Sequence, residues 1–296
     1  MMEKVKTWLS LLVIIICLPY LVTFVVQGDF LNDGQQQESA GKDSQEDTGK
    51  LVLILAKEMP VTFEKEALKA QAVIARTNLA YAKAHDQTEP ESISWEDMRD
   101  QLGAKDFQRC YDLLKSCVEE TSGEIITRKK KLIQLPYHYV SAGKTRNASE
   151  LDEKSGMPYL KSVESANDLQ CERFLKIEFL SKKQFQNKLK EAYPDLDFEQ
   201  DTIEKMASVE KRDRASYVLT VQLPGKKVTG EEFRKIFSLH SACFSIKEVD
   251  GQVRIVTKGY GQGFGMSQFG ADKMAEDGSS YEEILSYYYD GIAIDG

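Results

Sequence analysis

The stretch LVLILAKEMPVTFEKEALKAQAVIARTNLAYAKA occupies Leu51–Ala84. It begins with an apolar run, Leu51–Ala56, which predicts a buried strand. Pro60 suits the first turn of a helix, where its missing N–H costs nothing. From Glu64 to Ala84 the residues are strong helix formers without glycine or proline, and apolar side chains recur every three or four positions. The pattern predicts a strand that leads into an amphipathic helix, with Glu58 at the junction.

The position of Glu58 places two opposing influences on its carboxyl group. A helix N-terminus stabilises the carboxylate. The flanking Met59 and Phe63 form an apolar setting that favours the neutral acid. A carboxyl group balanced in this way can donate and accept a proton near neutral pH. A solvated surface glutamate with an apolar neighbour would have the same local sequence, so these residues alone leave both interpretations open.

Two segments resemble the signatures of the stage II sporulation protein D family. They are AKEMPVTFEKEALKAQAVIART at residues 56–77 and GYGQGFGMSQFGA at residues 259–271. The segments occur in the family's order, and the resemblance extends from Leu51 to the C-terminus. It implies a lytic transglycosylase of peptidoglycan whose catalytic acid is the glutamate of the EMP triplet, here Glu58.

The resemblance also implies which residues contact the substrate. Arg76, in the first signature, is expected to stabilise charge or to hold Glu58 in place; a half-buried arginine with a solvated head group is the alternative. The segment at residues 138–145 is similar to the family's His-Ser-x-Ser-Gly-Gly-Lys-Thr, with Tyr139 and Ala142 as departures. The predicted substrate contacts are Arg76, Gln71, Ser141, Lys144, Lys161, Tyr260, Gln262, Ser267 and Gln268.

The second signature alternates glycine with larger residues. Glycine lets a sugar ring approach the backbone closely, and Tyr260 and Phe264 offer flat apolar surfaces for sugar faces. The family usually has histidine where this chain has Gln262, and glutamine does not titrate. We therefore expect either an enzyme that cleaves glycan strands to 1,6-anhydro products or a catalytically weak glycan-binding protein that localises a partner amidase. An ordinary hydrolase, which would need a second carboxylate, is a third alternative.

Composition limits the partners. The chain has 296 residues, is 42% hydrophobic and has a formal net charge of −8. This charge argues against nucleic acid or an anionic wall polymer held by bulk charge, whereas a peptide-free glycan is nearly neutral. Some family members bind zinc through one His and two Cys near the position of His85. Because no cysteine lies close to His85, we predict no metal and no cofactor.

The N-terminal residues predict a membrane anchor. Lys4 and Lys6 precede the uncharged apolar stretch Trp8–Val26, which is long enough to span a bilayer. A cleavable signal peptide is the alternative, but no cleavage site with small residues follows Val26. We expect a cytoplasmic tail at 1–7, a signal anchor at 8–26 and a disordered polar linker at 27–50. Residues 51–296 would then form an extracytoplasmic catalytic domain on the cell membrane. By resemblance, its partners would be glycan strands, an amidase and a membrane scaffold of the engulfment machinery in sporulating cells.

The mixture of periodicities predicts an α+β fold, with a mixed sheet and packed helices. Four cysteines beyond the anchor, Cys110, Cys117, Cys171 and Cys243, could form two disulfides or could be buried thiols. Helices are predicted at 64–84, 94–102, 105–120, 181–192, 200–208, 228–237, 266–277 and 281–289. Besides 51–56, strands are predicted at 125–131, 132–140, 175–180, 238–246 and 252–258, and a turn followed by a strand is predicted at 211–223.

Overall fold

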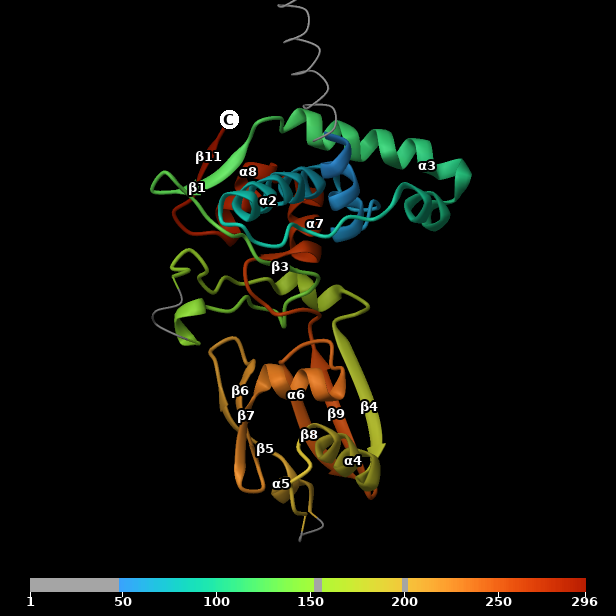
Figure 1. Cartoon of the computed structure of the whole chain (residues 1–296), viewed down its shortest axis with the longest axis vertical. Helices are drawn as coiled ribbons and strands as arrows, with labels where there is room; N and C mark the ends of the chain where they lie inside the picture. Colours follow the sequence, from blue (N-terminus) through green and yellow to red (C-terminus); the bar gives the residue numbers. More distant parts are fainter. Residues whose placement is uncertain (1–47, 152–155, 199–201) are drawn as a thin grey trace, which may run out of the picture. The chain divides into compact units, whose positions relative to one another are not determined.

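The computed structural model describes residues 48–151, 156–198 and 202–296. Residue contacts divide the chain into two units, Met1–Lys50 and Leu51–Gly296. The second unit contains all the helices and strands labelled in Figure 1. Within the described ranges, no helix is long and apolar enough to cross a membrane. The predicted anchor at 8–26 lies outside those ranges, as does nearly all of the predicted linker.

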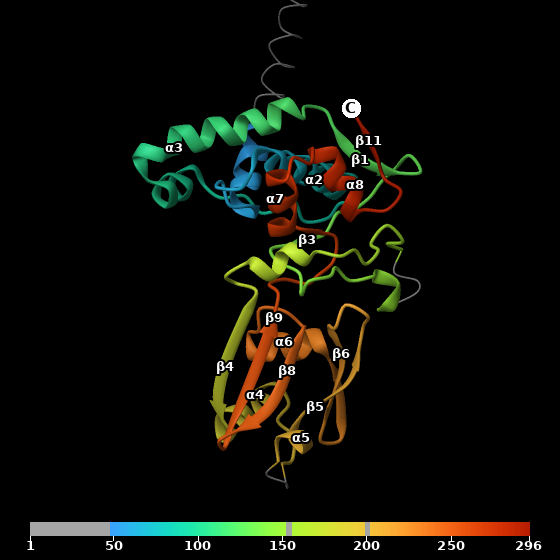
Figure 2. The ribbon, with the colours of Figure 1, turned by 180° about the vertical axis from the view of Figure 1, so that it is seen from behind.

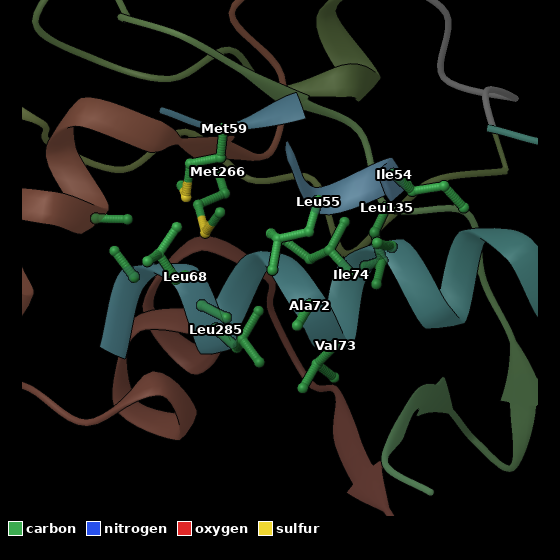
Figure 3. Packing of buried hydrophobic residues seen from close by; sticks show 14 of the residues in the cluster. Ile54, Leu55, Met59, Leu68, Ala72, Val73, Ile74, Leu135, Met266 and Leu285 are labelled. Atoms are coloured by element: carbon green, nitrogen blue, oxygen red, sulfur yellow. The ribbon is translucent and has the colours of Figure 1, made fainter. Parts of the chain in front are cut away.

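The first element that the structure describes is a helix, although a strand was predicted there. Residues 48–58 are helical, so the prediction for Leu51–Ala56 is wrong. A short apolar run is compatible with either element, and here the buried side chains are spaced as on one helix face. These side chains are Leu51, Val52, Ile54 and Leu55. They share a core with helix α2 (Lys65–Ala84), and Figure 3 shows Leu55 over that helix and Met59 beside Met266.

A helical lobe surrounds α2. Helix α3 (Trp95–Glu120) joins the two helices predicted at 94–102 and 105–120 across a kink at Gly103, where φ is 73°. Ser94 caps this helix by accepting from the N–H of Asp97, which agrees with the helix start predicted at residue 94. Two further helices pack on α2, namely α7 (Gln268–Glu276) and α8 (Tyr281–Tyr288). A small antiparallel sheet has the order β11-β1-β2, formed by β11 (Ala293–Asp295), β1 (Ile125–Arg128) and β2 (Lys131–Leu132).

A second lobe contains two antiparallel sheets. One has the order β4-β9-β8, formed by β4 (Leu175–Ser181), β9 (Gln252–Lys258) and β8 (Phe244–Val249). The other has the order β5-β6-β7, formed by β5 (Ser208–Arg212), β6 (Val218–Leu223) and β7 (Lys226–Thr229). The helices of this lobe are α4 (Lys182–Ala192), α5 (Ile203–Met206) and α6 (Gly230–Phe237). Figure 2 shows β4, β9 and β8 in front of α4 and α6.

Two helix starts and one hairpin turn in this lobe follow from short sequence motifs, whereas some predicted boundaries differ from those of the structure. Ser181 and Thr229 each begin a helix with a complete capping box. Asp250 and Gly251 both have positive φ, as a two-residue hairpin turn requires. The strand predicted at 238–246 begins only at 244. The turn and strand predicted at 211–223 are found, with the end of β5 before the turn and β6 after it. The helix predicted at 200–208 is reduced to one turn, α5.

Two long-range segments run side by side between the lobes. Strand β3 (Tyr137–His138) pairs in parallel with β10 (Met266–Ser267), so the strand predicted at 132–140 is mostly irregular. A Cβ on Gly265, where φ is 68°, would lie 1.8 Å from the carbonyl oxygen of Pro136. A Cβ on Gly261 would lie 2.6 Å from the Cβ of His138. These two glycines therefore serve close packing of protein on protein, whereas the sequence suggested space for a sugar.

The fold is α+β, as predicted, with several small sheets in place of one mixed sheet. Cys110, Cys117, Cys171 and Cys243 are all buried and free. The buried-thiol alternative is therefore the one found, and no disulfide joins these four residues.

Candidate functional site

Glu58 lies at the end of the helix formed by residues 48–58. This is the reverse of the predicted setting, because the carbonyl groups at a helix C-terminus disfavour negative charge. Burial is the main cause that raises the pKa of its carboxyl group from 4.5 to about 7, while hydrogen bonds with Tyr137 and Gln71 lower it. The carboxyl group is therefore balanced between its two forms near neutral pH.

Two buried glutamine amides hold Glu58. Gln71 Nε2 donates to Glu58 Oε2 over 2.7 Å. Gln268 Nε2 donates to Gln71 Oε1 over 3.2 Å and to the backbone oxygen of Glu58 over 2.8 Å. Gln71 is fully buried and Gln268 is 3% exposed, so both amides are fixed within the core. This amide relay, Gln268–Gln71–Glu58, joins the first signature to the second.

Glu58 lines a cavity of about 470 Å³. Its walls are formed by Lys57, Glu58, Asn78, Tyr81, Ala82, Gln87, Thr88, Pro90, Glu91, Gln134 and Tyr137. A second cavity, of about 730 Å³, has Gln262 and Phe264 in its wall and shares Asn78, Gln134 and Tyr137 with the first. The two cavities therefore adjoin along these shared residues, and together they bring Glu58 and the glycine-rich segment to one cleft.

Hydrogen bonds fix two polar side chains in the wall of the cleft, Asn78 and Gln262. The amide of Asn78 donates to the Leu135 oxygen over 3.0 Å and accepts from the Leu135 N–H over 2.8 Å. Gln262 Nε2 approaches the Tyr137 oxygen at 3.4 Å, and its side chain is exposed. These bonds hold the segment before β3 against α2, and they place Tyr137 between the two cavities. Gln262 is thus available to a ligand in the second cavity.

Arg76 does not meet the expectation that it holds Glu58. Its guanidinium donates to the backbone oxygens of Val118, over 2.8 Å, and Glu124, over 3.2 Å. It also contacts the hydroxyl of Thr121, which follows α3. An arginine in this place satisfies free carbonyls at a helix C-terminus. The structure therefore shows Arg76 joining α2 to the end of α3, outside the walls of both cavities.

Ser141 and Ser267 are buried and face a buried acid, so their predicted contact with substrate is not supported. Asp168 Oδ2 accepts from the Ser141 N–H over 2.8 Å, and its Oδ1 accepts from the Ser267 hydroxyl over 2.9 Å. Burial raises the pKa of Asp168 above its usual value, and hydrogen bonds from Ser141 and Ser267 oppose the rise. Ser267 also caps α7. Asp168 thereby joins the segment at residues 138–145 to the second signature.

The remaining predicted contacts lie away from both cavities. Lys144 pairs with Glu164 at 2.6 Å, and Lys161 pairs with Asp290 at 2.7 Å, both on the surface. Tyr260 stacks on His240, with ring centroids 4.4 Å apart. Of the predicted contacts, Gln71 and Gln268 thus lie against Glu58, and Gln262 lies in the same cleft. The other predicted contacts lie elsewhere in the structure. Within the described ranges, no group of His, Cys, Asp and Glu could hold a metal ion.

Comparison with known proteins decides the family. The family model described as "Stage II sporulation protein" matches residues 50–128. Stage II sporulation protein D of Bacillus amyloliquefaciens is 35% identical over 255 residues, which cover 81% of this chain and 72% of that protein. The chain belongs to the stage II sporulation protein D family. Its relative of the same name in Bacillus subtilis (strain 168) is 30% identical with the same coverage.

A more distant relative of this chain has a different name. The amidase enhancer of Bacillus subtilis (strain 168) is 27% identical over 293 residues, covering 81% of this chain and 39% of that protein. The similarity therefore concerns one part of the longer protein.

Several residues at the candidate site of this chain were not identified from the sequence. Tyr137 and Asn78 line both cavities, and Glu91 lines the one that contains Glu58. Arg146 is 1% exposed, pairs with Asp213 at 2.7 Å and donates to the Gln262 oxygen over 3.1 Å. The only local signal for Tyr137 was its position directly before the segment at residues 138–145. Glu91 and Asp213 had none, because their roles depend on contacts that are distant in sequence.

Proposed function

We propose that this protein is a membrane-anchored lytic transglycosylase that cleaves the linkage between N-acetylmuramic acid and N-acetylglucosamine in peptide-free peptidoglycan during sporulation. The observation that supports this proposal is the Glu58 carboxyl group. It has a pKa of about 7, is held by a buried amide and lines a cavity that adjoins a second one. A single carboxyl group of this kind can act first as an acid and then as a base.

The reaction needs one proton shuttle. Neutral Glu58 donates its proton to the glycosidic oxygen as the bond from that oxygen to C1 of the muramic acid breaks. The resulting carboxylate then accepts the proton of the 6-hydroxyl group on the same sugar, whose oxygen bonds to C1. The product has a 1,6-anhydro ring, no water is consumed, and Glu58 returns to its neutral form.

The amide relay orients Glu58, and the cleft positions the sugar. Gln71 directs the carboxyl group through its 2.7 Å bond. The adjoining second cavity, with Gln262 and Phe264 in its wall, offers an amide for sugar hydroxyls and an aromatic surface for a sugar face. Gln262 does not titrate, so it positions the sugar and transfers no proton.

Product analysis by mass spectrometry tests this proposal. On peptide-free glycan strands, the wild-type chain should give anhydro-ended products, and Glu58→Gln should bind the strands without cleaving them. Glu91→Gln is the matched control, because it removes another carboxylate from the same cavity. It should retain the anhydro products. Cleavage by Glu58→Gln at the wild-type rate would contradict the assignment.

Glu91 makes an ordinary glycoside hydrolase the second candidate. Such enzymes use two carboxylates, and Glu91 lines the cavity that contains Glu58. Hydrolysis consumes water and leaves reducing ends. Reducing-end products that disappear in both Glu58→Gln and Glu91→Gln would favour this function over the transglycosylase.

The similarity to an amidase enhancer favours a third candidate, a glycan-binding protein that localises an amidase. Gln262 in place of the family's usual histidine agrees with weak catalysis. In that case, glycan strands would be bound but not shortened. Binding by the wild-type chain without any change in strand length would favour this function.

The proposed location is the cell membrane, with residues 51–296 on the outer side. Trp8–Val26, preceded by Lys4 and Lys6, supports an anchor of this orientation. The chain should therefore sediment with membranes, and a version that begins at residue 27 should not. Protease added to intact protoplasts should digest residues 51–296, and protection of those residues would contradict the orientation.

A further inference from the structure

The outer face of the β4-β9-β8 sheet bears an exposed apolar strip. Leu175, Ile177 and Phe179 on β4 are 49%, 50% and 53% exposed. Val256 lies beside Ile177 on β9 and adds to the strip. The opposite face of the sheet is covered, because Phe244, Val253 and Ile255 pack in the core with α4 and α6. In Figure 2 the three strands lie in front of those helices, so the strip faces away from the core.

The same face is positively charged. Directly opposed residues in an antiparallel sheet point to the same side. Arg254 is opposite Phe179, Lys258 is opposite Leu175, and Lys247 on β8 is opposite Arg254. No acidic residue occupies the outward positions of the three strands, which are filled by Leu175, Ile177, Phe179, Ser181, Gln252, Arg254, Val256, Lys258, Ser245, Lys247 and Val249. This face therefore contrasts with a chain whose net charge is −8.

We propose that this face binds an acidic amphipathic helix of a partner protein. A sheet normally buries its apolar face against another layer, and large exposed apolar patches mark interaction sites. The three cations on one flank of the strip complement acidic side chains on the same flank of such a helix. A second copy of this chain would instead bring cations against cations.

The dimensions of the strip match a helix. Alternate residues along a strand are about 6.7 Å apart, and residues four apart along a helix rise by about 6 Å. Leu175, Ile177 and Phe179 would therefore face apolar residues at i, i+4 and i+8 of the partner. A helix about 10 Å wide covers about two strands. Its acidic flank would then lie toward Arg254 on the central strand β9 and Lys247 on β8, on the side of the strip away from the β4 edge.

This proposal is independent of the chemistry at Glu58, and peptide binding tests it. The probe is a fluorescent helical peptide with leucine at i, i+4 and i+8, glutamate along one flank and alanine elsewhere. It should bind the full-length chain, and Ile177→Ser and Phe179→Ser should each weaken binding on the order of tenfold. The control Leu169→Ser changes a side chain that is 58% exposed but lies outside the sheet, and it should bind as the wild type does.

A charge exchange separates docking from a general loss of structure. One variant combines three changes, Lys247→Glu, Arg254→Glu and Lys258→Glu. It should no longer bind the glutamate peptide, and it should bind the same peptide with lysine in place of glutamate. The proposal is overturned if the wild type does not bind the peptide or if Leu169→Ser weakens binding equally. It is also overturned if the charge exchange fails, if the strip causes self-association in sedimentation, or if it binds vesicles of anionic lipid in preference to the peptide.

Discussion

Glu58→Gln is expected to change how the stability of the folded chain depends on pH. Burial raises the pKa of Glu58 from 4.5 to about 7. Between these values the folded chain holds a proton that the unfolded chain releases. The free energy of unfolding contributed by this group is therefore fully present below about pH 4.5 and is lost as pH rises through 7. At about 1.4 kcal/mol per pKa unit, the loss amounts to about 3 kcal/mol.

The variant has no proton to lose at this position. Urea unfolding of both proteins, at a series of pH values from about 4 to about 8, gives the difference in their free energies of unfolding. Relative to the wild type, Glu58→Gln should gain about 3 kcal/mol across this range. His138 is buried, with its pKa lowered to about 4, and it destabilises the fold as pH falls from 6.5. Because His138 is present in both proteins, its effect cancels in the difference.

A difference that does not change between about pH 4 and pH 8 would refute this reasoning. It would mean that Glu58 is solvated in the folded chain, as the alternative interpretation of its local sequence held. Glu91→Gln is the matched control, because Glu91 lines the same cavity but is exposed. Its difference from the wild type should remain flat over this range.

Three further changes test the surroundings of the site. Gln71→Met removes the donor to Glu58, so the pKa of Glu58 should rise, and the alkaline limb of the pH profile of glycan cleavage should move up by about one pH unit. Arg146→Met leaves the buried carboxylate of Asp213 unpaired and should cost about 3–5 kcal/mol in urea unfolding. Gly265→Ala would place its Cβ 1.8 Å from a backbone oxygen, and circular dichroism should show loss of the folded state.

Each of these changes has a control within the chain. Gln268→Met leaves the bond from Gln71 to Glu58 in place and should move the pH profile less. Lys144→Met removes an exposed ion pair and should cost less than about 1 kcal/mol. Gly278→Ala, at positive φ with open space around the new Cβ, should leave the chain folded. If a control variant has the same effect as the variant with which it is paired, the contact invoked for that prediction does not explain the effect.

Local signals in the sequence predicted much of the second lobe. The capping residues Ser181 and Thr229 set the starts of α4 and α6, and Asp250-Gly251 set the turn between β8 and β9. Such signals depend on residues a few positions apart, so they can be recognised without the fold. The strand predicted at Leu51–Ala56 failed, because an apolar run that short does not distinguish two kinds of buried element.

The site itself was only partly predictable. Glu58, Gln71 and Gln268 were found through the two signatures, and the structure connects all three. Ser267 belongs to the second signature and Ser141 to the segment at residues 138–145, yet both turn inward to Asp168, which is 99 and 27 residues away in sequence. Whether a hydroxyl faces a ligand or a buried acid depends on that distant partner. No property of the serine or its neighbours in sequence gives the answer.

The position of Arg76 and the pKa of Glu58 are physically connected. A guanidinium beside the carboxyl group would favour its charged form and hold its pKa below the usual range. A carboxylate so stabilised would be a poor proton donor near neutral pH. Arg76 instead binds the carbonyls at the end of α3, and the neutral amide of Gln71 orients Glu58. An amide can fix the carboxyl group without adding a charge, so positioning is achieved while burial keeps the pKa at about 7.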